Sequence, residues 1–219
     1  MSVKIKICGV RSPEFVDAAV EAGADYVGVV FFEKSPRHVT PAEAALVTKA
    51  ASGRIRSVAV LFDPDDLLIE DVLAIAGPDL LQLHGRETPE RVTDIRSRFG
   101  KPVIKAIRVA QAADAVAAER YWETADIVLF DAKADAAPGG NGIPFDWQAL
   151  LGVTREKGFA LSGGLTAENV ADAIRFTGAS MVDVSSGVER RPGEKDHDLI
   201  RRFVSAARAA AKPVEALAT

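Results

Sequence analysis

Residues 80–108, LLQLHGRETPERVTDIRSRFGKPVIKAIR, decide the fold. They hold two short apolar runs, which begin near Leu80 and Pro102, on either side of a helix-like segment, Pro89–Phe99. Thr88 before Pro89 is a typical helix start, because a threonine side chain caps the first turn and proline fits the first helical position. A strand, a helix and a second strand of these lengths predict two parallel strands joined by a crossover helix.

The same unit recurs along the whole chain. Eight strand-like runs follow one another at intervals of 22 to 32 residues, beginning near Val3, Tyr26, Arg56, Leu80, Pro102, Ile127, Phe159 and Met181. Further helix-like segments are Pro13–Ala22, Pro41–Ala51, Ala110–Trp122 and His197–Ala211, with capping side chains expected at Ser12, Thr40 and Thr166.

Eight such units predict an α/β protein with a single closed (β/α)₈ barrel, the TIM-barrel architecture. The barrel would span residues 1–211, and residues 212–219 would form a C-terminal tail. An open doubly wound sheet is the alternative. It is disfavoured because the turn after the first strand reads Cys8-Gly9-Val10-Arg11-Ser12, without a G-x-G-x-x-G fingerprint.

Composition excludes several classes of protein. The chain has 219 residues and a formal net charge of −4, which argues against a general nucleic-acid binder. Its single cysteine excludes an intrachain disulfide, and the three histidines show no metal-ligand spacing, so no metal site is expected. No apolar run is long enough for a transmembrane helix and the first residues do not resemble a signal peptide, so we expect a cytoplasmic protein.

Polar residues share one face of four strands. Because side chains alternate along a strand, Lys4, Lys6 and Cys8 fall opposite Ile5 and Ile7. The other inward sets are Gln82 and His84; Leu129 and Asp131; and Met181, Asp183 and Ser185. These polar groups either satisfy one another in the barrel interior or serve chemistry at the carboxyl ends of the strands, where barrel enzymes place their active sites.

Glycine-rich loops follow the last two strands. Ser162-Gly163-Gly164 precedes a helix expected near Thr166, and Ser185-Ser186-Gly187 ends the eighth run. Glycines either simply turn the chain or let backbone amides approach a phosphate, which these two loops commonly bind in barrels. A third glycine-rich stretch, Pro138–Gly142, is long enough to act as a lid.

Three further side chains are candidates for acid–base and binding roles. Arg37 follows Pro36 in a long loop and is either a solvated rim residue or a guanidinium ready for a carboxylate. Cys8 is either a small buried hydrophobe or a base, whose thiolate the nearby Lys6 ammonium would favour. Asp131 lies at the same level of another strand, so Cys8 and Asp131 could move two protons on one substrate.

Taken together, the motifs resemble the phosphoribosylanthranilate isomerase family over essentially the whole chain. The matching stretches are Lys6–Gly9, Phe32–Arg37, Leu81–Gly85, Leu129–Ala132, Gly139–Gly142 with Phe145–Trp147, Leu161–Leu165 with Asn169–Val170, and Val182–Glu189 with Pro192–Lys195. The chain departs from the family pattern in the expected lid, where Asn141 stands in place of the commoner threonine and Pro144 follows.

The resemblance implies a reaction and roles for its residues. The family performs an Amadori rearrangement of an aminoaldose to an aminoketose in tryptophan biosynthesis, without cofactor or metal. By resemblance, Cys8 is the general base, Asp131 the general acid, and Arg37 the partner of the substrate carboxylate. Phosphate and ribose contacts are implied for Gly163, Gly164, Asp183, Ser185, Ser186 and Gly187, and supporting roles for Lys6, Gln82 and His84.

Other functions remain open at this level. The histidine-pathway isomerase performs the same chemistry with two aspartates, so Cys8 argues for the tryptophan-pathway reaction. A neighbouring tryptophan-pathway barrel, a non-catalytic barrel that senses a sugar phosphate, and a structural subunit are further alternatives. The expected partner is a small sugar-phosphate substrate, with no nucleic acid or membrane, and the protein is either a monomer or a homodimer.

Overall fold

A computed structural model describes residues 3–132, 147–151, 153 and 158–210. Eight parallel strands close into a barrel in chain order, with β1 hydrogen-bonded to both β2 and β8. The strands are β1 (Lys4–Cys8), β2 (Tyr26–Phe31), β3 (Arg56–Leu61), β4 (Leu80–Leu83), β5 (Val103–Val109), β6 (Ile127–Ala132), β7 (Ala160–Leu161) and β8 (Met181–Val184). The predicted (β/α)₈ barrel is therefore confirmed, and every strand begins within one residue of its expected position.

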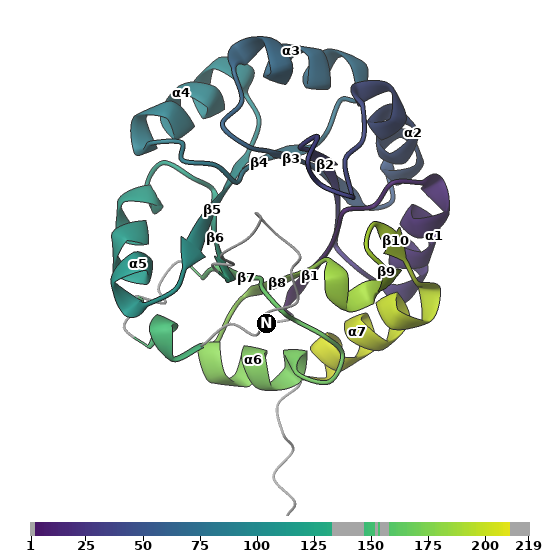
Figure 1. Ribbon diagram of the computed structural model, residues 1–219, viewed down its shortest axis with the longest axis vertical. Coiled ribbons are helices and arrows are strands. Elements are labelled where there is room, and N and C mark those ends of the chain that lie inside the picture. Colours follow the sequence, from purple (N-terminus) through teal and green to yellow (C-terminus); the bar gives the residue numbers. More distant parts are fainter. Residues whose placement is uncertain (1–2, 133–146, 152, 154–157, 211–219) are drawn as a thin grey trace, which may run out of the picture.

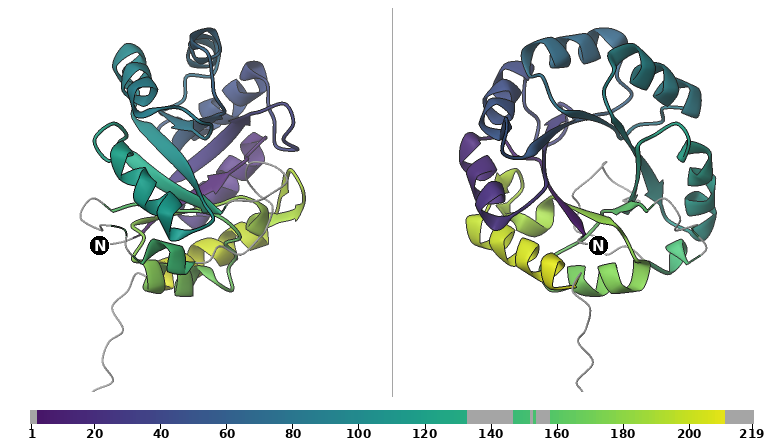
Figure 2. Two further views of the ribbon diagram at one scale, coloured as in Figure 1. Left: turned by 60° about the vertical axis from the view of Figure 1, so that its left-hand side comes forward. Right: turned by 180° about the vertical axis from the view of Figure 1, so that it is seen from behind.

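Helices surround the barrel as an outer ring (Figure 1). They are α1 (Pro13–Ala22), α2 (Pro41–Ala51), α3 (Asp66–Ile75), α4 (Pro89–Phe99), α5 (Ala112–Val116), α6 (Val170–Thr177) and α7 (His197–Ala210). Short 3₁₀ helices are η1 (Ala117–Tyr121), η2 (Trp147–Leu150) and η3 (Ser186–Val188). Seen from behind and from the side, the ring continues around the strands (Figure 2). No helix of the described residues is long and apolar enough to cross a membrane.

The expected helix over residues 110–122 is wrong in detail. The segment forms the short α5 and then tightens into η1. This tighter turn ends with Tyr121, whose hydroxyl donates a hydrogen bond to the Glu87 carbonyl at 2.9 Å. The hydrogen bond from Tyr121 to the loop between β4 and α4 is a tertiary contact, and local helix propensity does not encode such contacts.

One expected helix cap is corrected: Ser12 makes no side-chain cap. Thr40 and Thr88 accept hydrogen bonds from the amides of Glu43 and Arg91, as expected. Thr166 accepts from the Glu168 amide at 3.2 Å, as expected, although α6 itself begins at Val170. There the Asn169 side chain accepts from the Thr166 amide and donates to the Gly164 carbonyl, which holds these residues in a turn before the helix.

The interior of the barrel has the alternation that the sequence indicates. Ile5, Ile7 and their counterparts on the other strands pack against the helices in the main core. The opposite faces fill the barrel with a separate apolar layer, formed by Tyr26, Val58, Leu80, Ile104, Ala106, Leu129, Ala160 and Met181. Lys4 is exposed at the amino end of β1 and pairs with Asp25, whereas the other inward polar residues lie beyond this layer, toward the carboxyl ends of the strands.

One element was not expected from the sequence. Between η3 and α7 the chain forms an antiparallel two-stranded hairpin, β9 (Glu189–Arg191) and β10 (Glu194–Lys195). Figure 1 shows these two strands inside the helix ring, apart from the barrel sheet. The expected lid at Gly139–Gly142 and the tail at 212–219 lie outside the described residues.

Candidate active site

The end of β1 places a lysine and a cysteine on the inner wall. Lys6 is fully buried, and its ammonium donates to Asp183 Oδ2 at 2.9 Å, across the register that pairs β1 with β8. Cys8 follows two residues later on the same face and is paired with Gly28 of β2. The pairing brings a thiol, an ammonium and a carboxylate into one buried cluster.

Gly28 is a site residue that the sequence reading missed. A Cβ atom at this position would lie 3.0 Å from Lys6 Nζ and 3.1 Å from Cys8 Sγ. Glycine in the middle of strand β2 therefore makes room for both side chains. The available sign was a glycine inside a strand-like run, a pattern that often marks a close approach of another group.

The structure corrects the expected ionisation of Cys8. Burial raises the pKa of the thiol above its ordinary value, and the negative charge of Asp183 raises it further. The Lys6 ammonium opposes both effects without cancelling them. Lys6 also donates to Asp183, so its ammonium favours the Cys8 thiolate only in part.

Asp183 has one oxygen bonded to Lys6 and one without a hydrogen bond among the described residues. Burial raises the pKa of Asp183, opposed by the neighbouring Lys6. Its Oδ1 is buried, and none of the described residues gives it a hydrogen bond. A buried acceptor without a partner costs free energy unless a ligand donates to it.

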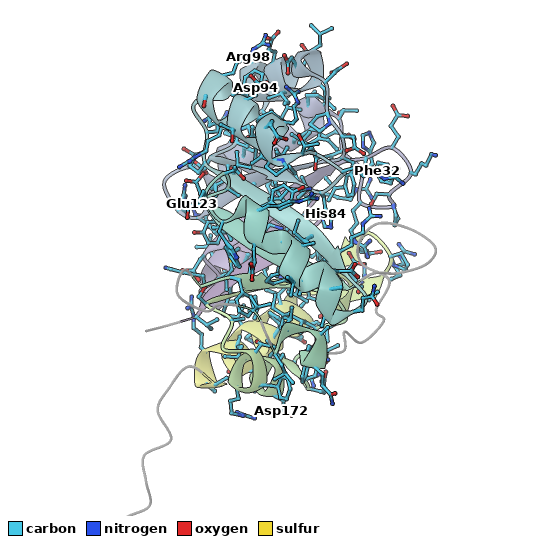
Figure 3. All side chains as sticks on the ribbon, turned by 90° about the vertical axis from the view of Figure 1, so that its left-hand side faces the viewer. Phe32, His84, Asp94, Arg98, Glu123 and Asp172 are labelled. Carbon is cyan, nitrogen blue, oxygen red and sulfur yellow. The ribbon has the colours of Figure 1, made fainter. Side chains whose placement is uncertain are left out.

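A second polar chain runs from β4 to β6. Gln82 Nε2 lies 3.2 Å from His84 Nδ1, and His84 Nε2 lies 3.1 Å from Asp131 Oδ2. Because the Gln82 amide nitrogen only donates, His84 Nδ1 accepts and Nε2 carries the proton that is donated to Asp131. Figure 3 shows His84 in the middle of the molecule, whereas Asp94 and Arg98 lie on the outer helix α4.

Arg37 is buried, not a solvated rim residue, with an exposed fraction of only 6%. Its Nε donates to Glu189 Oε1 at 2.8 Å and its Nη2 to Glu189 Oε2 at 2.7 Å. A bidentate pair of this kind fixes the plane of the guanidinium. Glu189 lies in the hairpin that the sequence reading did not predict, so its role was missed as well.

The two expected phosphate loops lie side by side. Gly163 and Gly164 both adopt positive φ angles, of 97° and 64°, and no described group accepts a hydrogen bond from their amides. A Cβ on Gly187 would lie 1.9 Å from the Leu165 carbonyl oxygen, so this glycine allows the loops after β7 and β8 to touch. Since α6 begins later than expected, the loop amides rather than a helix end face this site.

One cavity brings six of the twelve expected site residues together, without Gly163, Gly164, Ser186 and Gly187 of the phosphate loops. It is lined by Cys8, Val30, Ser35, Arg37, Val60, Phe62, His84, Asp131, Ser162, Asp183 and Ser185. Lys6 and Gln82 do not line this cavity, but they are hydrogen-bonded to Asp183 and His84, which do. A larger neighbouring cavity of about 610 Å³ shares Phe62 but none of the candidate acids and bases. Among the described residues, no cluster of side chains has the arrangement of a metal site.

Comparison with known proteins identifies the family. The family model described as N-(5'-phosphoribosyl)anthranilate (PRA) isomerase matches residues 5–206. The chain belongs to the phosphoribosylanthranilate isomerase family.

Relatives of this family match nearly end to end. The phosphoribosylanthranilate isomerase of Paramagnetospirillum magneticum is 52% identical, over 95% of this chain and 98% of the relative. The isomerase of Parvibaculum lavamentivorans is 49% identical, over 96% of this chain and the whole relative.

Solved structures of the isomerase family show the same barrel. The phosphoribosylanthranilate isomerase from Thermotoga maritima superposes with a TM-score of 0.86 at 37% identity, covering 94% of this chain and 99% of that one. An isomerase solved in complex with reduced 1-(o-carboxyphenylamino)-1-deoxyribulose 5-phosphate superposes with a TM-score of 0.83 at 36% identity, with the same coverage.

Proposed function

We propose that this chain converts N-(5'-phosphoribosyl)anthranilate into 1-(2-carboxyphenylamino)-1-deoxyribulose 5-phosphate by general acid–base catalysis. The observation that carries the proposal is that Cys8, Asp131 and Arg37 line one cavity together with Asp183 and Ser185. An acid and a base on different strands, beside a guanidinium and a glycine-lined loop, match a substrate that has a sugar ring, a carboxylate and a phosphate.

In this proposal Asp131 is the general acid. His84 Nε2 donates to one of its oxygens, which leaves the other oxygen to carry and give the proton. Proton transfer to the ribose ring oxygen breaks the bond between that oxygen and C1', and the nitrogen lone pair forms the Schiff base. Gln82 supports the step by holding the tautomer of His84.

Cys8 is the general base of the second step. It takes the proton from C2', and the electrons of that C–H bond form the enolamine, which tautomerises to the ketone. Because burial raises the pKa of the thiol, Lys6 beside it supplies the positive charge that the thiolate needs.

The remaining contacts hold the substrate in place. Arg37 would bind the anthranilate carboxylate, with the ring against Val30, Val60 and Phe62. The open oxygen of Asp183 would accept from a ribose hydroxyl. The phosphate would lie among the backbone amides and serine side chains of the two loops formed by Gly163, Gly164, Ser185, Ser186 and Gly187. The protein would act in the cytoplasm, as a monomer or a homodimer.

A fluorescence assay tests the assignment. Phosphoribosylanthranilate is generated in situ and the loss of its emission is followed with the wild-type protein, Cys8→Ser and Asp131→Asn. We expect rapid loss with the wild type and a kcat reduced by about 10²- to 10⁴-fold in each variant. Near-normal kcat in a folded variant would remove that residue from its role. No loss with the folded wild type would refute the substrate, and the histidine-pathway aminoaldose would be tested next.

A further inference from the structure

The β9–β10 hairpin interrupts the regular alternation of strands and helices. It follows η3 and precedes α7, and it pairs with no strand of the barrel sheet. A closed barrel has no free edge that such a hairpin would need to cover. Its contacts with the active site therefore call for a separate explanation.

The hairpin brings two buried charged side chains to Arg37. Glu189 receives two hydrogen bonds from the guanidinium and a third from Lys195, whose Nζ lies 2.7 Å from Glu189 Oε1. The exposed fractions of the three side chains are 7% for Arg37, 3% for Glu189 and 1% for Lys195. Burying three charged side chains costs free energy of folding, because each loses its hydration. Their presence here therefore points to a role in the site.

Lys195 also connects the cluster to the end of β8 and to Cys8. Its ammonium donates to the Ser185 carbonyl at 3.0 Å and lies 3.3 Å from Ser185 Oγ. The same hydroxyl donates to the Cys8 carbonyl at 3.1 Å. One continuous chain of hydrogen bonds thus joins the guanidinium to the strand ends that carry the candidate base and the phosphate loop.

Two glycines let the backbone close around Arg37. A Cβ on Gly9, which has a φ of 78°, would lie 2.5 Å from Arg37 Cδ. A Cβ on Gly193 in the hairpin turn, with a φ of 83°, would lie 2.4 Å from the Pro36 carbonyl oxygen. The loop after β1 and the hairpin turn therefore pack closely against the Pro36–Arg37 segment from two sides.

Among the described residues, Glu189 is bonded to two cations, Arg37 and Lys195, at a site that would receive an anionic substrate group. Burial lowers the pKa of Lys195 to about 8, opposed by Glu189, so the ammonium is retained at neutral pH. Burial tends to raise the pKa of Glu189, but Arg37 and Lys195 outweigh it and keep this carboxylate ionised.

We propose that Glu189 and Lys195 are positioning residues, which hold Arg37 in the orientation that selects a carboxylate-bearing substrate. This inference rests on the proposed role of Arg37. It assigns the hairpin a function in specificity: Glu189 fixes the guanidinium plane, and Lys195 ties Glu189 to Ser185.

The test compares two substrates in matched variants. Phosphoribosylanthranilate and phosphoribosylaniline, which lacks the carboxylate, are each given to wild type, Glu189→Gln, Lys195→Met and Glu194→Gln. Glu194 is the control, because it lies in the same hairpin and pairs with Arg190 and Arg191 instead of Arg37. Product is measured by chromatography and folding by circular dichroism.

We expect Glu189→Gln to raise KM for phosphoribosylanthranilate by roughly 10- to 100-fold, with a smaller change in kcat. Turnover of phosphoribosylaniline should change little, so discrimination between the substrates shrinks. Lys195→Met should shift it in the same direction, and Glu194→Gln should leave both substrates within about twofold of wild type. If Glu189→Gln does not fold, the Glu189→Gln/Lys195→Met double variant, which removes one charge of each sign, takes its place.

The outcomes separate the proposed role of the hairpin from the proposed function of the protein. Wild-type turnover with unchanged discrimination in the folded hairpin variants would overturn the inference alone. Equal losses on both substrates would also overturn it, because a merely structural role affects both alike. A wild type that does not turn over phosphoribosylanthranilate would overturn the proposed function and the inference together.

Discussion

Lys6 lies between the Asp183 carboxylate and the Cys8 thiol. The division of its positive charge between these two groups sets the pKa of Cys8. The hydrogen bond to Asp183 uses the ammonium charge that the Cys8 thiolate would otherwise share. Removing the negative charge of Asp183 should release that ammonium. We therefore expect the three side chains to titrate as a coupled group rather than as separate sites.

The titration of Cys8 tests this coupling. Because Cys8 is the only cysteine, its Cβ labelled with carbon-13 gives a single NMR signal to follow against pH. We expect a midpoint above the ordinary value of 9.0, since burial and Asp183 both favour the thiol. Asp183→Asn should lower the midpoint, because it removes a repulsive charge and frees Lys6. A wild-type midpoint below 9.0 would contradict the assignment.

A substitution of Arg37 distinguishes binding of the substrate carboxylate from binding of the rest of the substrate. We expect Arg37→Ala to raise KM for phosphoribosylanthranilate by about 100-fold, since a charge-assisted hydrogen bond to the carboxylate is lost. The decarboxylated analogue should lose far less. The measurement is the ratio of the KM values for the two substrates. If KM rises equally for both, Arg37 is not the partner of the carboxylate.

At the scale of the elements, α1 and α2 start alike but are capped differently. α1 and α2 both begin with a proline after a hydroxyl residue, Ser12 and Thr40. Only Thr40 completes a capping box, in which its side chain accepts from the Glu43 amide and the Glu43 carboxylate accepts from the Thr40 amide. The same local pattern thus has two different outcomes.

These two helices provide a matched pair of substitutions. Thr40→Ala should lower the free energy of unfolding by about 1 kcal/mol, because an amide of the first turn loses its acceptor. Ser12→Ala should leave the free energy of unfolding almost unchanged, since no cap is lost. Urea denaturation measures both values. A larger loss in Ser12→Ala would mean that its hydroxyl caps the helix in solution.

At the scale of the whole molecule, the two ends of the chain close the ring. Arg208 of α7 donates to Asp25 Oδ2 at 2.7 Å and to the Gly23 carbonyl at 2.8 Å. Asp25 also accepts from the Ile5 amide at 2.9 Å and from Lys4 at 2.8 Å. Asp25 therefore ties the first strand to the last helix.

Arg208→Met should lower the free energy of unfolding by about 1 kcal/mol, an amount reduced by partial exposure to solvent. Arg202→Met, which breaks only an exposed pair with Glu168, is the control and should cost almost nothing. Burial tends to raise the pKa of Asp25, but its hydrogen bonds from Lys4, Ile5 and Arg208 lower it below 3.8.

The sign of the pH effect follows from that lowered pKa. The folded state favours the ionised carboxylate, so its stabilisation is complete above the ordinary value and is lost as the pH falls through the folded value. The difference in unfolding free energy between wild type and Arg208→Met should therefore shrink below about pH 4. A difference independent of pH would show that Arg208 acts through its contacts with the Gly23 and Val3 carbonyls alone.

The sequence by itself determined the barrel, the inward faces of four strands and the strand ends that carry Cys8 and Asp131. These properties depend on apolar periodicity and on the order of elements, which a chain carries locally. The two glycine loops follow from the same order, whereas the bond between Lys6 and Asp183 of β8 appears only in the closed barrel.

Only the tertiary structure decided the hairpin, the resting protonation of Cys8 and the cluster around Arg37. Glu189 and Lys195 lie more than 150 positions from Arg37 in the chain, so no local pattern links them to it. The pKa of Cys8 depends on burial and on how Lys6 divides its charge, which exist only once the barrel has closed. Long-range electrostatics, unlike hydrophobic periodicity, has no sequence period by which it can be recognised.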